Sequence, residues 1–535
     1  MATNIAFYGS HNGGLVVEKD GNYYILEFER FFNVKNSGLA QYKTLRYRDE
    51  GLRSMLQYIE KELCIVPPFD NLLHINTECS FDDQCVSYKD YIPARNVYEG
   101  FHHHSHASGS FYQSSFDKAL IFSFDGGGND CFFNIFTATR KDGVTYIGKT
   151  NPTESAPFDI DLGFPYMSFA HFCNDINQEW ISDGNLVYSG KIMGLCNYGN
   201  VHEEWVPYFK QYYRSRPEGT NYINKLNTII GENCGLVFDD NNRFEDQLSW
   251  DIAATSQRVF EDIFFEIATP YIEKYDDLPI IITGGCALNI LLNTKMAERY
   301  PGRPVYVAPN SNDCGIAFGL LAAFNKPNTP VDITYGGMEL LDINAFPGWV
   351  ESSDAKRVDL DHITTKLMNG KIFGVIQDRC EHGPRALGNR SIICDPSFPQ
   401  MKDILNHKVK HREWYRPFAP VVRLEDVSKY FEWEGESRYM QFCPKVREEW
   451  REKLSSITHI DGTARVQTVT REQNPWLYEL LTVFASKAEH GVLLNTSFNV
   501  AGKPILNTIA DAMKVLETSE MDYLVINDFY CGKYW

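Results

Sequence analysis

The sequence predicts an α/β fold, in which short apolar strands alternate with helices around a core. Short apolar runs that each end in a polar or glycine-rich turn indicate the strands. Longer segments with apolar residues at helical spacing lie between these runs and indicate the helices. The chain has 535 residues, 43% of them hydrophobic and 23% charged, which is typical of a globular protein and excludes a disordered one. We expect two to four domains from this length.

The first strands form a hairpin-like pattern near the amino terminus. A turn-rich segment at 9–14 separates a strand at 5–8 from a strand at 15–17. The sequence Lys-Asp-Gly-Asn at 19–22 is a turn, and a third strand follows it at 23–26. Further strands that end in polar or glycine-rich turns are predicted at 119–124, 280–283 and 305–308.

Two segments carry the clearest helical patterns. Residues 314–325 are rich in Ala, Gly and Leu and predict a tightly packed helix. Residues 252–275 predict a longer helix, because apolar side chains recur at helical spacings, at Ile252, Val259, Phe260, Ile263, Phe264 and Ile267.

The periodic pattern weakens around 328–355, where Pro and Gly are frequent, and we interpret this segment as a linker. Strands are predicted after it, at 372–376 and 492–494. The last segment, of about 180 residues, has the size of a separate domain. The expected domains are therefore residues 1–345 and 355–535. We find no short repeat and no low-complexity tract.

The net charge of −19 argues against a general nucleic-acid coat, although it leaves room for a local basic site. The 13 cysteines include no C-x-x-C pair and are odd in number, which favours reduced thiols and a cytoplasmic location. The amino terminus resembles no secretory signal. No run of about 18 apolar residues predicts a membrane span.

Glycine-rich motifs recur in the first domain, and glycine lets backbone amides approach a phosphate closely. Asp125-Gly126-Gly127-Gly128 follows a predicted strand, so its carboxylate is also suited to a metal. Gly284 and Gly285 follow another strand, in a motif that ends at Asn289, and residues 189–194 place a lysine among glycines. Each motif alone is more typical of a tight turn. Three of them in one α/β domain favour a nucleotide cleft.

The segment Phe-His-His-His-Ser-His-Ala at 101–107 contains a candidate metal site. On a helix, His102 and His106 are four residues apart and share a face, whereas His103 and His104 point elsewhere. Two imidazoles at this spacing, with a distant carboxylate, form a common metal site. A polar helix end or a partly buried histidine cluster is the competing interpretation.

Basic residues are concentrated at 381–391 and 408–420, although the chain is acidic overall. Guanidinium groups bind phosphates and carboxylates bidentately. A solvated basic face is the alternative, but Trp414, Tyr415, Phe418 and several prolines are unusual on such a face. We therefore predict a phosphate-binding pocket. The polar segment 495–499 follows a strand and is suited to the same pocket.

Together these motifs resemble the O-carbamoyltransferase family of the NodU/CmcH type, over nearly the whole chain. The most specific parts are Gly-Pro-Arg-Ala-Leu-Gly-Asn-Arg-Ser at 383–391, Arg-Pro-Phe-Ala-Pro at 416–420 and Leu-Asn-Thr-Ser-Phe-Asn-Val at 494–500. The resemblance implies an amino-terminal actin/Hsp70-like (ASKHA) ATPase fold for carbamoyl transfer. It also implies a carboxyl-terminal YrdC-like domain, in which ATP and carbamoyl phosphate form carbamoyl-adenylate.

The resemblance also implies site residues. It assigns a divalent metal, preferably Fe²⁺ but with Mn, Zn or Co compatible with the ligands, to His102, His106, Asp125 and Asp313. It assigns nucleotide contacts to Lys35, Gly126, Gly127, Gly284, Gly285 and Asn289. Contacts to carbamoyl phosphate and ATP, with Mg²⁺ accompanying the ATP, fall on Arg385, Lys410, Arg416, Arg465, Asn495 and Ser497. His11 corresponds to the catalytic histidine.

Two motifs depart from the family pattern. The usual His-Asp-Ser-Ala-Ala is His-Asn-Gly-Gly-Leu at 11–15, and the usual Arg-Gly-Glu-Pro is Ala-Gly-Lys-Pro at 501–504. The first change removes a carboxylate beside His11, which bears on acceptor chemistry more than on carbamoyl activation.

The expected activity is transfer of a carbamoyl group to a hydroxyl of a natural product, a sugar or a hydroxymethylated nucleobase. Threonylcarbamoyl transfer to tRNA is a second hypothesis, disfavoured because no extended basic surface is indicated. A sugar kinase-like ATPase is a third, but it would leave the basic motifs without a use. We expect no membrane partner, and a homodimer.

Overall fold

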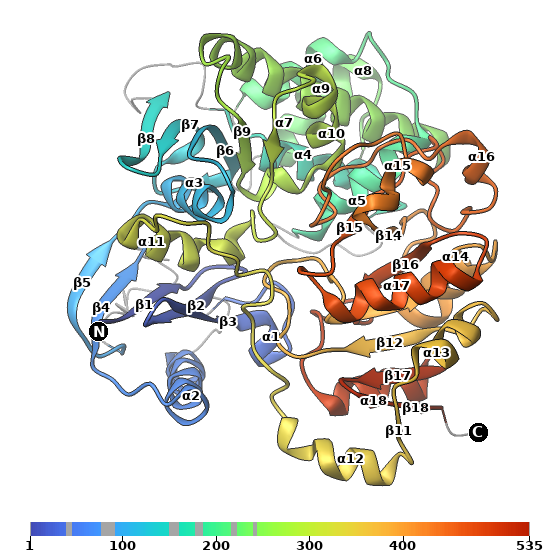
Figure 1. The fold of residues 1–535 in the computed structure, drawn as a ribbon. Coiled ribbons are helices and arrows are strands. Elements are labelled where there is room, and N and C mark those ends of the chain that lie inside the picture. The colour runs from blue at the N-terminus through green and yellow to red at the C-terminus, as the bar shows by residue number, and fades with distance from the viewer. Residues whose placement is uncertain are drawn as a thin grey trace.

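A computed structural model describes residues 2–38, 45–75, 91–148, 160–176, 186–215, 222–238 and 243–533. Two five-stranded sheets lie in the amino-terminal region, which we define as residues 2–325, and an eight-stranded sheet lies in the carboxyl-terminal region, residues 356–533 (Figure 1). Helices cover the faces of all three sheets. The predicted α/β class is confirmed.

The first sheet has the strand order β3-β2-β1-β4-β5. Strands β1, β2 and β3 are antiparallel neighbours, and β4 and β5 continue the sheet parallel to β1. The predicted first three strands are confirmed. The strand bounds are Thr3–Tyr8 (β1), Gly14–Lys19 (β2), Asn22–Glu27 (β3), Phe69–His74 (β4) and Ala94–Glu99 (β5). Helix α1 (Phe28–Phe32) follows β3, and α2 (Leu45–Leu63) packs on one face.

The second sheet has the order β10-β9-β6-β7-β8 and repeats the pattern of strand directions of the first. Strands β6, β7 and β8 take the places of β1, β2 and β3, and β9 and β10 those of β4 and β5. The bounds are Lys118–Gly128 (β6), Cys131–Thr139 (β7), Gly143–Gly148 (β8), Ile280–Thr283 (β9) and Val305–Tyr306 (β10). The amino-terminal region is therefore built from one topology used twice.

Helices α3 (His102–Gln113) and α11 (Ile316–Asn325) lie between the two sheets and share one core with both. Their backbones approach closely, because a Cβ atom on Gly319 would lie only 2.0 Å from the carbonyl oxygen of Ser105. On α3, a Cβ on Gly109 would lie 3.2 Å from the Cα of Gly319. This contact holds the two helices, and the polar residues at their ends, in one arrangement.

Gly319→Ala is expected to destabilise the protein by about 1–3 kcal/mol, because the added methyl group must push α3 and α11 apart. The higher helix propensity of Ala offsets only about 1 kcal/mol of this. Gly190→Ala in helix α5 (Val187–Leu195) is the matched control, since no atom of another part of the chain lies within 4 Å of its added Cβ. Thermal unfolding of both variants checks the prediction, which a Tm for Gly319→Ala at or above that of the wild type would contradict.

The other face of the second sheet packs against α9 (Asp246–Lys274), which starts earlier than the predicted helix at 252–275. Phe264 of α9 contacts Phe122 and Phe124 of β6, with ring centroids 5.7 and 4.9 Å away. The remaining helices of this layer are α4 (Gly163–Ser168), α5 (Val187–Leu195), α6 (Val206–Arg214), α7 (Tyr222–Leu226), α8 (Glu232–Cys234) and α10 (Ile290–Arg299).

The carboxyl-terminal sheet has the order β11-β18-β17-β12-β13-β16-β14-β15. One face packs against α13 (Leu360–Leu367) and α17 (Pro475–Lys487), and the other against α18 (Ile509–Thr518). The strand bounds are Lys356–Arg357 (β11), Phe373–Ile376 (β12), Arg390–Cys394 (β13), Ala419–Arg423 (β14), Gln467–Val469 (β15), Val492–Ser497 (β16), Tyr523–Ile526 (β17) and Phe529–Gly532 (β18). Shorter helices are α14 (Met401–Asp403), α15 (Val427–Tyr430) and α16 (Glu448–Arg451).

Four local predictions are corrected. The predicted linker contains helix α12 (Phe346–Ser352). Pro347 does not interrupt this helix, because it stands in the first turn, where proline is favoured. Strand β6 runs through the predicted turn at 125–128, with an irregular register that glycines permit. The lysine motif at 189–194 lies inside helix α5. The polar residues Asn495 and Ser497 lie within β16, not after it.

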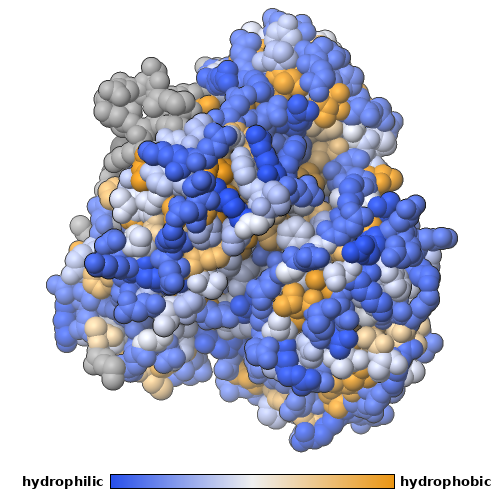
Figure 2. Space-filling view, turned by 45° about the horizontal axis from the view of Figure 1, so that its top comes forward, coloured by the Kyte–Doolittle hydropathy of each residue, from blue (hydrophilic) through white to orange (hydrophobic). Residues whose placement is uncertain are grey.

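The face of the molecule shown in Figure 2 is mainly hydrophilic, with separate apolar patches. Within the described residues, no helix has both the length and the apolar character that crossing a membrane requires.

Candidate functional site

A turn that follows β6 caps the first turn of helix α3. The backbone N–H of His102 donates to Asn129 Oδ1 at 2.9 Å, and that of His103 donates to Asp130 Oδ1 at 2.9 Å. The first N–H groups of a helix lack partners within the helix, so these side chains satisfy them. The cap therefore places the histidines of α3 beside the end of β6.

Four predicted metal ligands meet at this point. His102 and His106 from α3, Asp125 from β6 and Asp313 at the start of the 3-10 turn η8 (Asp313–Gly315) each offer one atom to a group whose atoms all lie within 4.8 Å of one another. His102 Nε2 lies 2.8 Å from Asp125 Oδ2 and 3.2 Å from His106 Nε2. His106 Nε2 lies 3.5 Å from Asp313 Oδ1. All four residues are buried. Two imidazole nitrogens and two carboxylates that converge in this way fit a divalent transition metal.

The histidines and carboxylates of this cluster stabilise each other's charged forms. Burial disfavours the charged form of His102, but Asp125 and Asp313 outweigh it and raise its pKa to about 9. Burial would raise the pKa of Asp313, but the nearby His11 and His102 lower it to about 2. The carboxylates are therefore ionised and ready to act as ligands.

Tyr8 at the end of β1 and His11 in the turn between β1 and β2 contact the same cluster. The Tyr8 hydroxyl donates to Asp313 Oδ2 at 2.9 Å, and His11 Nδ1 lies 3.4 Å from the same oxygen. The side chain of His11 is 43% exposed, so it faces both the cluster and solvent. The predicted catalytic histidine is thus next to the predicted metal ligands. Tyr8 was not predicted, because a tyrosine in an apolar strand carries no sequence signal of a polar role.

The other two histidines of the motif have different partners. His103 is buried, and its ring nitrogens bond to Ser123 Oγ at 2.8 Å and to the Cys131 carbonyl at 2.9 Å. His104 Nε2 donates to the Val144 carbonyl at 3.3 Å. The bond of His104 lies outside the cluster, as predicted, whereas His103 Nε2 also lies 3.5 Å from Asp125 Oδ1, so its ring is beside the cluster although it was predicted to point elsewhere.

The glycine motifs are next to the cluster, but parts of them have structural roles. Gly284 has a φ of +90°, and a Cβ there would lie 2.3 Å from the Phe124 carbonyl, so glycine is needed where β9 meets β6. Gly285 lies against Asp125, since a Cβ on Gly285 would lie 3.5 Å from Asp125 Cβ. The N–H of Gly127 donates to Asp125 Oδ1 at 2.8 Å, and Gly126 is exposed.

Asn289 has structural partners already. Its Oδ1 accepts from the Leu292 N–H at 3.0 Å, which caps helix α10, and its Nδ2 donates to Gln257 at 2.9 Å. A nucleotide contact by this side chain would compete with the cap, so its predicted role stays a prediction.

A second cluster, made of cations, lies in the carboxyl-terminal region around Arg416. Burial together with neighbouring positive charges lowers the pKa of five cations in it, and that of Arg385 falls to about 10 beside Arg416. The Nε atom of Arg465 is buried without a hydrogen-bond partner within the described ranges. The five cations, all with Arg416 as a neighbour, are Arg385, Lys410, Arg412, Arg465 and Lys35. Such a concentration of poorly compensated positive charge is suited to polyanions.

Polar groups border the cation cluster. The ammonium group of Lys410 donates to the Ser497 carbonyl at 2.6 Å and also contacts Asn499. Asn495 is fully buried, and its Nδ2 donates to Gln467 Oε1 at 2.6 Å and to the Ala386 carbonyl at 3.1 Å. Its Oδ1 atom is buried without a partner among the described residues, which leaves an acceptor for a ligand.

The structure changes the grouping of two residues. Lys35, predicted with the glycine motifs, belongs with Arg416 and Lys410 across the region boundary. Arg412 was not predicted as a site residue although its motif was, because no spacing rule separates it from its basic neighbours. It stacks on Phe418, 4.3 Å from the ring centre, and donates to Asn406.

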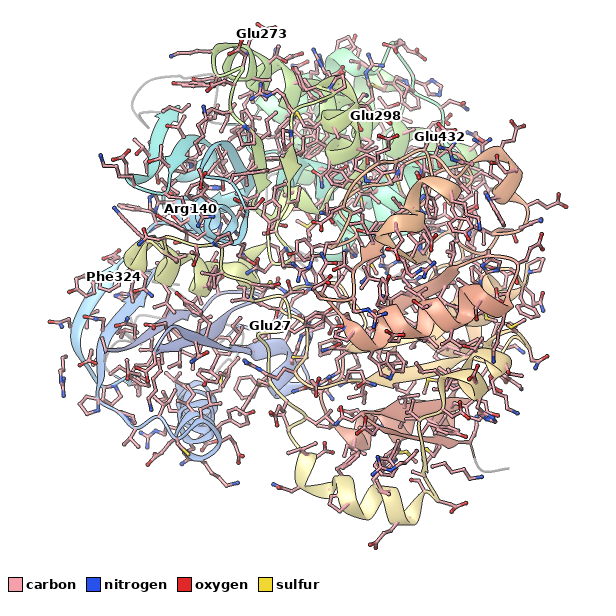
Figure 3. The ribbon with its side chains drawn as sticks, in the orientation of Figure 1. Glu27, Arg140, Glu273, Glu298, Phe324 and Glu432 are labelled. Carbon is pink, nitrogen blue, oxygen red and sulfur yellow. The ribbon has the colours of Figure 1, made fainter. Side chains whose placement is uncertain are left out.

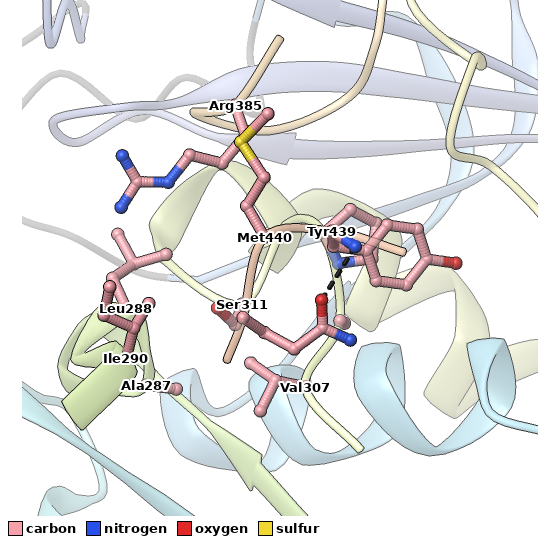
Figure 4. Close-up of a pocket in the computed structure, with 11 residues that line it drawn as sticks. Ala287, Leu288, Ile290, Val307, Ser311, Arg385, Tyr439 and Met440 are labelled. Carbon is pink, nitrogen blue, oxygen red and sulfur yellow. Dashed lines mark hydrogen bonds between the residues drawn. The ribbon is translucent and has the colours of Figure 1, made fainter. Parts of the chain in front are cut away.

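A pocket lies between the amino-terminal and the carboxyl-terminal region. Its walls come from residues 287–290 and 307–311 of the amino-terminal region and from residues 439–441 and Arg385 of the other (Figure 4). The Tyr439 N–H donates to the Gln441 side chain there at 2.7 Å. Apart from Arg385, Ser311 and Gln441, the walls are largely apolar.

Comparison with known proteins identifies the family. Residues 73–323 match the description Carbamoyltransferase N-terminus, and residues 364–533 match Carbamoyltransferase C-terminus. Nodulation protein NolO of Bradyrhizobium diazoefficiens is 31% identical over 81% of this chain and 78% of that protein. A 3'-hydroxymethylcephem-O-carbamoyltransferase of Streptomyces clavuligerus is 38% identical over 52% of each chain.

Likeness to solved structures is weaker. A crystal structure of full-length HypF aligns with a TM-score of 0.35 and 14% identity, over 61% of this chain and 46% of that one. The two family matches and the identity to NolO decide the assignment: this chain belongs to the carbamoyltransferase family.

Proposed function

We propose that this protein is an ATP-dependent O-carbamoyltransferase. The observation that carries the proposal is the presence of two chemically different polar clusters in one chain of this family: a cationic one around Arg416 and a histidine–carboxylate one around His106. One cluster suits the gathering of anions, and the other suits a metal and a neutral hydroxyl. The name of the Streptomyces relative, an O-carbamoyltransferase, supports transfer to oxygen.

We also propose the finer fold assignment. Two sheets with the same order and directions, and helices packed between them, support an actin/Hsp70-like carbamoyl-transfer domain over residues 1–345. The family resemblance and the separate eight-stranded sheet support a YrdC-like, adenylate-forming domain over residues 355–535.

Activation would take place at the cation cluster. Carbamoyl phosphate and ATP are both anions, and Arg385, Lys410 and Arg416 would offset their mutual repulsion. Conversion to carbamoyl-adenylate consumes one water and releases phosphate and pyrophosphate. The free Oδ1 of Asn495 would accept a hydrogen bond from the carbamoyl NH₂ group.

Transfer would take place at the histidine–carboxylate cluster. A divalent metal on His102, His106, Asp125 and Asp313 would supply charge for the adenylate phosphate and the carbonyl oxygen. His11, whose Nδ1 lies 3.4 Å from Asp313 Oδ2, would take the proton of the acceptor hydroxyl. Tyr8 donates to Asp313 Oδ2, the oxygen that His11 also approaches, and would so orient the carboxylate.

Pyrophosphate release tests the function. Release that needs both carbamoyl phosphate and ATP supports the proposal, because a sugar kinase-like ATPase would form ADP and a binding module would form neither product. A screen of sugars, natural products and hydroxymethylated nucleosides for the mass gain of one carbamoyl group would then identify the acceptor. Pyrophosphate release without carbamoyl phosphate would count against the proposal.

We expect the purified protein to hold about one equivalent of a divalent transition metal, with Fe²⁺ favoured by the family resemblance. The double variant His102→Ala/His106→Ala should hold almost none, because two of four ligands are lost. Elemental analysis measures this, and His362→Ala, on α13, is the control for histidine loss in general. Equal, low metal contents in the wild type and the double variant would refute the site.

A further inference from the structure

The carboxylate of Glu381 organises the loop that carries Arg385. Its Oε1 atom accepts hydrogen bonds from the backbone N–H groups of Leu387 at 2.7 Å, Asn389 at 2.8 Å and Arg390 at 3.0 Å. Glu381 is fully buried, so water does not compete for these bonds. Three charge-assisted bonds to one oxygen fix the backbone between Arg385 and β13. The shape of this loop therefore depends on one side chain.

The carboxylate of Glu381 faces a cation from the other region of the chain, which it shares with Glu27. Arg30, in α1, has a side chain with 0% exposure, and its Nη1 lies 3.9 Å from Glu381 Oε2. Its Nε lies 2.8 Å from Glu27 Oε2, and its Nη2 donates to the Gly383 carbonyl at 2.7 Å. Glu27 lies where the first sheet meets the carboxyl-terminal region (Figure 3). A buried carboxylate needs such a partner, so Arg30 connects α1 to the start of the loop.

His382, between Glu381 and the Arg385 loop, contacts the backbone next to the predicted metal ligand Asp313. His382 Nε2 donates to the carbonyl of Cys314, the residue after the predicted ligand Asp313, at 2.9 Å. A Cβ on Gly383, whose φ is +126°, would lie 2.3 Å from the Pro309 carbonyl. Residues 381–383 are thus packed between the amino-terminal region and the Arg385 loop.

Glu27, Cys314 and His382 offer atoms close enough for a second metal site, but these atoms have partners already. Glu27 pairs with Arg30, and the Cys314 thiol donates to Asn312 Oδ1 at 2.9 Å. His382 donates to a backbone carbonyl and accepts from Asn310. Glu27, Cys314 and His382 are therefore each engaged by protein groups, and we look for the role of this network in what it positions.

We propose that Arg30 and Glu381 are a positioning pair, through which the amino-terminal region sets the conformation of the Arg385 loop and with it the anion site of the carboxyl-terminal region. Neither residue touches the substrates; both act through Arg385. The inference rests on the proposed function, since it assigns the anion bound by that loop as carbamoyl phosphate. It predicts that a change in α1 weakens anion binding in the other region.

Three variants test the pair. Arg30→Met removes the positive charge that the amino-terminal region contributes to the pair. Glu381→Ala removes the carboxylate that accepts the three hydrogen bonds from backbone N–H groups. Glu381→Gln keeps an oxygen acceptor but removes the negative charge. Leu367→Ala is the control for lost stability alone, since Leu367 is the last residue of α13 and is buried in the core. For each protein, calorimetry gives the Kd of carbamoyl phosphate, pyrophosphate release gives its KM and kcat, and thermal unfolding gives Tm.

We expect Kd and KM to rise on the order of tenfold in Arg30→Met and Glu381→Ala, because small displacements of a binding group have large effects. Glu381→Gln should recover part of this loss, and Leu367→Ala should keep the wild-type Kd and KM. If Arg30→Met and Glu381→Ala keep the wild-type Kd while kcat falls with the folded fraction, the pair is only structural and the proposal is overturned.

The same data separate this inference from the proposed function. A wild type that binds carbamoyl phosphate but releases no pyrophosphate would refute the function, and the Kd values would still decide the role of the pair. A wild type that does not bind this anion at all would overturn both.

Discussion

Arg416→Ala is expected to lower the rate of pyrophosphate release by a factor of about 30–1,000. Arg416 is the shared neighbour of the cation cluster, whose other members are Arg385, Lys410, Arg412, Arg465 and Lys35. Loss of one such contact to an anionic transition state should remove about 2–4 kcal/mol of stabilisation, by analogy with loss of one oxyanion-hole donor. Arg385→Ala should have an effect of similar size.

The folded state should tolerate this change. Positive neighbours surround Arg416, and its ion pair with Glu413 is long, at 3.6 Å. Arg423→Ala is the matched control, because Arg423 is in the same region but pairs with Asp426 at 2.8 Å outside the cluster. Steady-state pyrophosphate release and thermal unfolding of the three variants provide the measurements. Near-normal release by both Arg416→Ala and Arg385→Ala would remove the cation cluster from the mechanism.

His106→Ala is expected to abolish acceptor modification while carbamoyl phosphate and ATP are still consumed. The reason is that His106 belongs to the histidine–carboxylate cluster, whereas the cations that we propose gather the two substrates lie around Arg416. Arg416→Ala should fail at both steps. Preformed carbamoyl-adenylate should therefore restore acceptor modification in Arg416→Ala and leave His106→Ala inactive.

Mass spectrometry of the acceptor, combined with a pyrophosphate assay, distinguishes these outcomes. His202→Ala is a suitable control, since this histidine bonds to Asp251 at 2.8 Å away from the cluster. Rescue of His106→Ala by the adenylate, or rescue of neither variant, would contradict the assignment of two steps to two sites.

Local patterns in the sequence predicted much of the candidate site. The spacing of His102 and His106 predicted a shared helix face, and both lie on one face of α3 next to Asp125 and Asp313. Such a prediction succeeds because the period of a helix is fixed by backbone geometry, whatever surrounds it. The contribution of Asp125 and Asp313 came from the family resemblance, because no local rule relates residues so far apart in the chain.

The tertiary structure alone joined residues from distant segments. Tyr8 bonds to Asp313, 305 residues away, and Arg30 reaches Gly383 across 353 residues. Lys35 belongs with Arg416 rather than with the glycine motifs. These contacts depend on which strands pair and on how the two regions dock, and neither property leaves a periodic signal in the sequence.

The repeated sheet also separates what the sequence determined from what only the tertiary structure decided. The sequence by itself determined the class of the protein, the positions of eight of the 18 strands in the described residues, the positions of helices α9 and α11, and the polar motifs, because these follow from hydrophobic period and turn chemistry. It showed no repeat, yet β1–β5 and β6–β10 have the same order and directions. Strand order is decided by hydrogen bonds between backbone groups and by the packing of α3 and α11 between the sheets, and many different side chains satisfy both conditions.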